Sequence, residues 1–179
     1  MRSFATLLAS FGALASIPAA QATTLERLSL SDLIAKSTSI VHARVTGSNC
    51  AMVGADVYTY YQLQVSEVLK AGGSPAQSLQ MAVPGGAAMG VRQLVPGAPK
   101  VTIGGDYVLF LWTSRSGLTQ VIGLSQGLFR MTQDSAGNAI LVRPVSEAPM
   151  VDKNGAAVID HAMTFRWSDV RAQILKAGN

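Results

Sequence analysis

Short apolar runs, interrupted every eight to twelve positions or so by Gly, Pro, Asn or Ser, are the dominant pattern of this chain. A coiled coil needs long heptad repeats, and a disordered chain needs dense charge. Here 49% of the residues are hydrophobic and only 13% are charged. The pattern therefore predicts a folded, mainly β protein, in which short strands are joined by hairpin turns.

The first 22 residues have the three-part pattern of a secretory signal peptide. A basic start at Met1-Arg2-Ser3 precedes an apolar run over residues 4–17, and Ala20-Gln21-Ala22 has the small-residue form that signal peptidase accepts. As a helix, that run would span about 20 Å, less than the roughly 30 Å of a membrane core. We predict cleavage before Thr23, export to the periplasm or the cell exterior, and no stable membrane insertion afterwards.

Residues 23–179 are predicted to form a single β-barrel domain. A domain of this size can bury a sufficient core without disulfides, and Cys50, the only cysteine, excludes an intramolecular disulfide. The formal net charge is +4, and Lys and Arg are scattered singly along the chain. We therefore expect no nucleic-acid partner, because such surfaces carry clustered basic residues.

The predicted elements begin with a short helix within residues 24–36, with Ser31-Asp32 as a cap, and end with a helix from Ser168, its N-cap, to Gly178. Residues 84–104, rich in Gly and Pro, are expected to form a long loop around a short extended piece. The predicted strands cover residues 39–45, 57–65, 78–83, 107–112, 118–122, 128–132 and 139–142. Together these elements indicate a small antiparallel OB-like β-barrel with a short N-terminal and a C-terminal helix.

Two local features of the strands can be predicted. Residues 107–112 are apolar at every position, which is typical of a strand covered on both faces. The adjacent tyrosines Tyr60 and Tyr61 interrupt the alternation of their strand, so a β-bulge is expected there.

Gly123-Leu124-Ser125-Gln126-Gly127 matches the G-x-S-x-G nucleophile motif of α/β-hydrolases. Asp134 or Asp152, followed by His161, has the chain order of a catalytic triad. The motif requires a strand-to-helix turn, whereas residues 128–132 are predicted to be a strand. We therefore predict a protein that is not an enzyme, and a small serine hydrolase using Ser125 remains the alternative.

Cofactor and metal motifs are incomplete. The loop at residues 85–90 has the glycine spacing of a phosphate loop but lacks its lysine. The two histidines, His42 and His161, have no second ligand at helical spacing. Residues 152–155 begin like a calcium loop, but turn chemistry explains them better. No cofactor and no metal are predicted.

The candidate binding surface consists of Tyr58, Tyr60, Met89 and Thr23. Tyr58 and Tyr60 leave the core face of their strand if Tyr61 lies on it. They could bind a protein or, in a third hypothesis, a sugar or lipid. Met89 is expected at the tip of an exposed loop, where it could contact a partner.

Three segments resemble the tissue inhibitors of metalloproteinases and related netrin-like modules: residues 37–47, 61–70 and 105–118. The same segments, with residues 84–86 and 126–129, are similar to an uncharacterised family of exported bacterial proteins. The resemblance implies an OB-type barrel that binds a protein, with an exported protease as the candidate partner. The inhibitors chelate zinc through an N-terminal cysteine, whereas this chain is predicted to begin at Thr23, so their inhibitory chemistry does not transfer.

Overall fold

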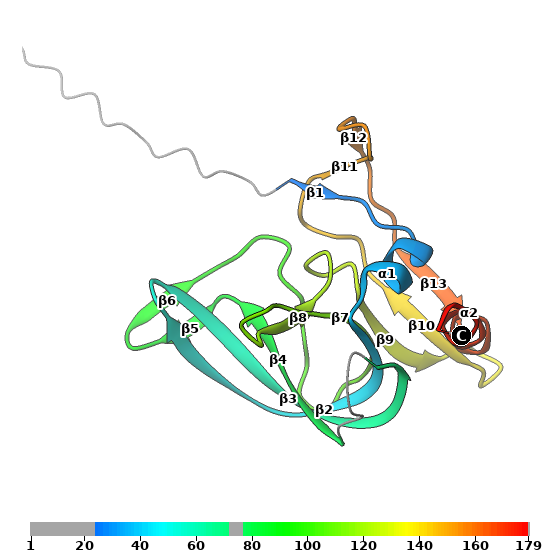
Figure 1. Cartoon of the computed structure of the whole chain (residues 1–179), viewed down its shortest axis with the longest axis horizontal. Coiled ribbons are helices and arrows are strands. Elements are labelled where there is room, and N and C mark those ends of the chain that lie inside the picture. Colours follow the sequence, from blue (N-terminus) through cyan, green and yellow to red (C-terminus); the bar gives the residue numbers. More distant parts are fainter. Residues whose placement is uncertain (1–23, 72–76, 179) are drawn as a thin grey trace, which may run out of the picture.

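The computed structural model describes residues 24–71 and 77–178 (Figure 1). The predicted signal peptide and Thr23 lie outside the described residues. The helices are α1 (Leu30–Lys36) and α2 (Trp167–Ala177). The strands are β1 (Leu25–Glu26), β2 (Ser39–Val53), β3 (Asp56–Lys70), β4 (Ser78–Pro84), β5 (Gly86–Ala88), β6 (Val91–Gln93), β7 (Asp106–Thr113), β8 (Thr119–Val121), β9 (Leu128–Gln133), β10 (Ala139–Arg143), β11 (Met150–Val151), β12 (Ala157–Val158) and β13 (Met163–Arg166).

The described strands form three sheets, of which the largest has eight strands. Its order is β13-β10-β9-β7-β2-β3-β4, with β8 paired to β7, and all of these pairs are antiparallel. The smaller sheets are β1-β11-β12, in which β1 and β11 are parallel, and the β5-β6 hairpin. The prediction of a mainly β fold with two helices and antiparallel sheets is confirmed.

The eight-stranded sheet is open, because β4 and β13 are its edges. It curls so that β8 approaches β4, but these two strands do not pair. Hydrogen bonding among the described strands therefore does not close the barrel that the sequence predicts.

The β2-β3 hairpin is longer than predicted. Residues 46–55, which the sequence predicts as a loop between the strands at 39–45 and 57–65, continue both strands up to a tight turn at Gly54, which adopts a φ of 65°. The bulge predicted at the double tyrosine is wrong, because Tyr60 and Tyr61 pair in register with Asn49 and Ser48. The shifts in register lie elsewhere along this hairpin, one of them between Val45 and Gly47.

Strand β7 separates two apolar cores, as its uninterrupted apolar sequence predicts. Val108 and Phe110 face the core that α1 and α2 cover, here called the helix-side core. Tyr107, Leu109 and Leu111 face the interior of the curled sheet, here called the hairpin-side core. All five side chains are at most 2% exposed, so β7 is covered on both faces.

The N-terminal helix begins later than predicted. The backbone at Leu25 and Glu26 forms β1 instead, and α1 is capped by Ser29 rather than by Ser31. Ser29 Oγ accepts a hydrogen bond from the Asp32 amide, and the Asp32 carboxylate accepts one from the Ser29 amide, both at 3.1 Å. This reciprocal pair of hydrogen bonds is a capping box.

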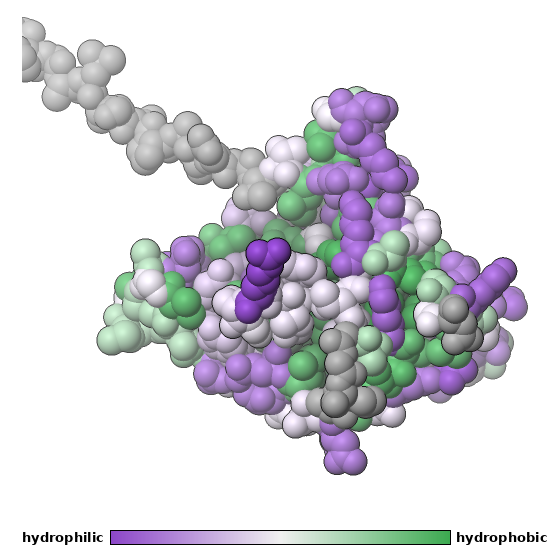
Figure 2. Space-filling model, viewed as in Figure 1, coloured by the Kyte–Doolittle hydropathy of each residue, from purple (hydrophilic) through white to green (hydrophobic). Residues whose placement is uncertain are grey.

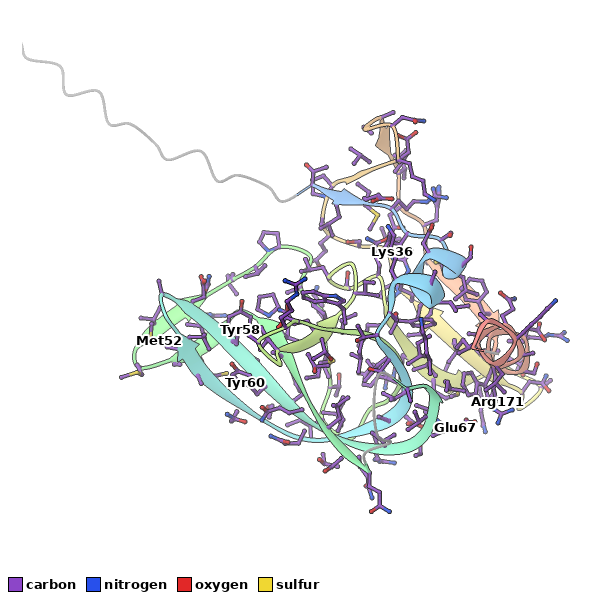
Figure 3. All side chains as sticks on the ribbon, in the orientation of Figure 1. Lys36, Met52, Tyr58, Tyr60, Glu67 and Arg171 are labelled. Carbon is purple, nitrogen blue, oxygen red and sulfur yellow. The ribbon has the colours of Figure 1, made fainter. Side chains whose placement is uncertain are left out.

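At the other end of the chain, α2 starts at Trp167, with Arg166 as its N-cap and no side-chain cap bond. The predicted cap, Ser168, donates its hydroxyl proton to Asp169 instead. Arg171 anchors the helix to β3 through an ion pair with Glu67 at 2.7 Å (Figure 3). No helix in the described part of the chain is long and apolar enough to cross a membrane.

Candidate binding surface and cleft

The β2-β3 turn region and the β5-β6 hairpin form one end of the molecule, here called the distal end (residues 49–60 and 86–94) (Figure 1). The contact between them is close, since a Cβ placed on Gly86 would lie 2.6 Å from Thr59 Oγ1. The Val57 amide also donates to Gln93 Oε1 at 2.6 Å. Tight packing of this kind fixes the two hairpins relative to each other.

Tyr58 and Tyr60 lie side by side on the outer face of β3 (Figure 3). Their ring centroids are 6.4 Å apart, the rings are tilted by 42°, and both residues are half-buried. Tyr61 points to the opposite face and packs against the hairpin-side core. Burial of Tyr61 raises the pKa of its phenol. The predicted division between Tyr61 and the outward-facing pair is therefore confirmed.

The residues around this pair are uncharged. In an antiparallel sheet, directly opposed residues share a face, and this register defines a surface that we call the tyrosine face. Its members are Gly47, Asn49 and Ala51 on β2, Tyr58, Tyr60 and Gln62 on β3, and Gln80 and Pro84 on β4. Ala82, which is opposite Tyr60, is buried. Polar side chains are present without any formal charge, so a partner can cover this face without desolvating an ion.

Exposed apolar side chains gather at the same end. Met89 is 89% exposed, Leu94 79% and Val53 50%, and Figure 2 shows apolar colouring over β5 and β6. We call Val53, Met89, Val91 and Leu94 the apolar tip. Met89 lies in the turn between β5 and β6, where it adopts a φ of 49°. An exposed apolar patch of this kind is typical of an interaction site.

The structure thus brings three of the four predicted surface residues, Tyr58, Tyr60 and Met89, to one end, while Thr23 lies outside the described residues. Sequence reasoning missed Val53 and Leu94. The exposure of Leu94 could have been predicted, because Leu94 is an apolar residue in a Gly- and Pro-rich segment. Such a segment is expected to form a surface loop rather than a core strand.

Cys50 lies at the distal end, within β2 rather than in the predicted loop, and it is exposed. Its Sγ is 3.4 Å from Thr59 Oγ1. This hydrogen bond and one with the Ala87 backbone lower the pKa of the thiol.

The G-x-S-x-G motif forms a tight turn between β8 and β9. Gly123 and Leu124 both have positive φ angles, and β9 rather than a helix follows at Leu128. The buried Gln126 side chain accepts a hydrogen bond from the Leu28 amide at 2.8 Å and donates one to the Glu26 carbonyl at 2.9 Å. The motif therefore ties the N-terminal strand to the large sheet.

The predicted triad partners are engaged elsewhere. The carboxylates of Asp134 and Asp152 each accept backbone hydrogen bonds within their own turns, which confirms turn chemistry at residues 152–155. His161 is exposed, and His42 Nε2 lies 3.0 Å from Asp106 Oδ1. Among the described residues, no hydrogen bond joins Ser125 to either histidine, and no group of three His, Cys, Asp or Glu side chains is placed to hold a metal.

Ser125 lines a cleft of about 380 Å³. The cleft lies between the loop at residues 97–102 and the segment at residues 144–147, over the β7-β9-β10 part of the large sheet. Its lining residues are Gly97, Ala98, Lys100, Thr102, Tyr107, Ser125, Leu128, Arg130, Val142, Pro144, Val145, Ser146 and Glu147. Charged, hydroxyl and apolar side chains all contribute, which is typical of a small-ligand site.

The resemblance to netrin-like modules remains a prediction. No family model, curated protein or solved structure matches the chain.

Proposed function

We propose that the protein is an exported, non-enzymatic binding module whose distal end binds a protein partner. The observation that carries this proposal is that Tyr58 and Tyr60, on one face of the β2-β3 hairpin, lie at the same end of the molecule as the apolar tip, whose β5-β6 part packs against the other face. The cores of protein interfaces are depleted in charge and enriched in aromatic residues and methionine. Tyrosine also supplies a large contact area at a low cost in conformational entropy.

The fold that we propose is an OB-like barrel left open between β4 and β8. What supports it is the curl of the large sheet around the hairpin-side core and the approach of β8 to β4. Barrels of this class bind ligands on a strand face and the adjoining loops. The resemblance of residues 37–47 and 61–70 to netrin-like modules suggests an exported protease as the partner.

A sugar ligand is less well supported than a protein. Tyr58 and Tyr60 are tilted by 42° to each other, so the two rings together do not form one flat platform for stacking. The four-residue apolar tip also offers a sugar no hydrogen-bonding side chain. A protein can fit both the tilted rings and the tip.

Parallel affinity capture tests the proposal. The full-length gene is expressed with its own leader, and the recovered protein is immobilised as wild type, as Tyr58→Ala/Tyr60→Ala and as Ile159→Ser. Ile159 is 78% exposed and lies in the connection between β12 and β13, outside the distal end, so it controls for the loss of surface apolar area. Circular dichroism first establishes that all three proteins are folded.

The expected result is an exported protein that is retained, in stoichiometric amount, by the wild type and the Ile159 variant but not by the tyrosine variant. An empty wild-type column, or equal retention by all three proteins, contradicts the proposal.

The second candidate is a small serine hydrolase. It is favoured by one observation, the opening of Ser125 onto the cleft. A serine nucleophile also needs a base within hydrogen-bonding reach. Labelling of Ser125 by a fluorophosphonate favours the hydrolase, and the absence of labelling favours the binding module.

A further inference from the structure

The cleft beside Ser125 lies on a different part of the protein from the distal end and has a chemistry of its own. Its floor is a single cross-strand row. Tyr107 on β7 is opposite Arg130 on β9, and Arg130 is opposite Val142 on β10. Directly opposed residues point to the same face of a sheet, so a phenol, a guanidinium and an apolar side chain stand next to one another.

One wall of the cleft is held by buried charge. The Ser146 amide donates to the Asp160 carboxylate at 2.7 Å, and Asp160 is in turn bound by Arg143 through two hydrogen bonds of 2.8 Å. The Arg143 and Asp160 side chains are only 4% and 5% exposed. This network fixes the segment at residues 144–147 before any ligand binds.

The opposite wall is held against the first by close packing. Gly97 has a φ of 78°, and a Cβ on it would lie 2.7 Å from the Ala148 Cβ. The Thr102 amide donates to the Tyr107 hydroxyl at 3.1 Å. The Lys100–Glu147 ion pair then joins the two walls at the exposed rim. The cleft is therefore formed in the unbound protein, which lowers the entropic cost of binding.

The charges in the cleft leave one cation in excess. Lys100 neutralises Glu147, whereas Arg130 has no ion-pair partner among the described residues. Tyr107 is only 2% exposed and its hydroxyl already accepts the Thr102 amide, so Ser125 supplies the hydroxyl donor that opens onto the cleft. A planar guanidinium beside a hydroxyl donor is suited to a carboxylate, which can accept two parallel hydrogen bonds from the guanidinium.

The rest of the cleft is apolar. Leu128 and Val142 contribute to the floor, and Val145 lies at the mouth, where it is 54% exposed. A volume of about 380 Å³ is at the small end of ligand sites in proteins.

We infer that this cleft binds a carboxylate attached to a short apolar group, with Arg130 as the carboxylate-binding residue. Two sources have this chemistry, a free short-chain carboxylic acid and the C-terminus of a peptide with an apolar last residue. The inference is independent of the distal end, because the two sites share no residue.

Amide-detected NMR titration of the full recovered protein tests the inference. The probes are sodium hexanoate, the peptide acetyl-Ala-Ala-Leu with a free carboxylate, and the same peptide as its C-terminal amide. We expect at least one acid to shift the amide signals of Arg130, Val145 and Ser146, and the peptide amide to cause no shift there. Shifts caused by hexanoate alone identify a free acid as the ligand, and stronger binding of the peptide identifies a chain terminus.

Two variants and one control locate the interaction. Arg130→Gln removes the guanidinium and is expected to weaken binding by roughly tenfold or more. Val145→Asp places a negative charge at the exposed mouth and should also prevent binding. Arg115→Gln removes the same charge from the exposed β7-β8 turn and should leave the affinity within about twofold of the wild type.

Three results would each overturn the inference. They are no shift with either acid up to about 10 mM, shifts of equal size caused by both the acid and the amide peptide, and unchanged affinity in the Arg130 variant.

Discussion

Arg143 and Asp160 form a buried, two-bond ion pair, in which Nη1 donates to Oδ2 and Nη2 donates to Oδ1, each at 2.8 Å. Burial alone raises the pKa of the Asp160 carboxyl group, but the hydrogen bonds from Arg143 and Ser146 outweigh burial and lower it overall. A lowered carboxyl pKa contributes stability above the unfolded pKa of about 3.9, and this stability is lost as pH falls through the folded pKa. At neutral pH the pair thus holds Ser146 and His161 next to the end of β10.

The first prediction concerns this pair. Asp160→Asn leaves the Arg143 guanidinium buried without a counter-charge, so we expect the free energy of unfolding in urea to fall by about 3–5 kcal/mol. Glu147→Gln removes an exposed ion pair with Lys100 and serves as the control, with an expected loss of about 0–1 kcal/mol. Equal losses in the two variants would show that the buried pair does not hold the segment.

The second prediction concerns the capping box of α1. Hydrogen bonds from the Ser29 hydroxyl and amide, and then from Lys153, lower the Asp32 pKa to about 2. Because the folded pKa is lowered, the contribution of Asp32 is present above pH 3.8 and is lost as pH falls through about 2. Carboxyl-detected NMR titration should give this value.

Two variants separate the causes of the lowered Asp32 pKa. Ser29→Ala should raise the Asp32 pKa towards 3.8, and Lys153→Gln should raise it less, because Ser29 is the larger cause. A wild-type Asp32 that titrates near 3.8 would contradict the capping geometry.

The third prediction concerns Ser125. With no histidine bound to its hydroxyl in the described residues, Ser125 should not react with a fluorophosphonate probe at neutral pH. Gel fluorescence of the probe-treated protein measures this, and an active serine hydrolase treated in parallel shows that the probe is reactive. Labelling that disappears in Ser125→Ala would establish the hydrolase instead.

The fourth prediction concerns processing. N-terminal sequencing of the protein recovered from the periplasm or medium should begin at Thr23, because signal peptidase cleaves after a small residue such as Ala22. Ala22→Phe should reduce cleavage and leave a heavier precursor. An exported wild-type protein that retains residues 1–22 would contradict the signal peptide.

Much of the fold follows from local pattern. The uninterrupted apolar residues of β7 predict its burial on both faces, and the alternation around Tyr61 predicts that Tyr58 and Tyr60 face outward. The end of the β2-β3 hairpin was harder to predict, because the Gly and Asn residues at 47–54 favour a loop locally. Pairing with β3, together with contacts to β5, stabilises the extended backbone there.

Other features depend on contacts that are distant in sequence. Arg143 and Asp160 are 17 residues apart, and the strands between them, β11 and β12, are only two residues long. Gln126 is bound to Leu28, 98 positions away, which no local motif indicates. The cleft likewise depends on the register that places Arg130 between Tyr107 and Val142. No local motif indicates which residues of β7 and β9 are opposite each other, because these two strands are not consecutive in sequence.

Site-specific photo-crosslinking in the exporting cell tests the central claim, that the distal end binds a protein partner, most directly. The photoreactive residue p-benzoylphenylalanine replaces Tyr60, Met89 or, as the control, Ile159, and adducts are detected through a tag on the protein. We predict a crosslinked species of the same mass from positions 60 and 89 and none from position 159. The absence of an adduct from both distal positions, or the same adduct from position 159, would contradict the claim.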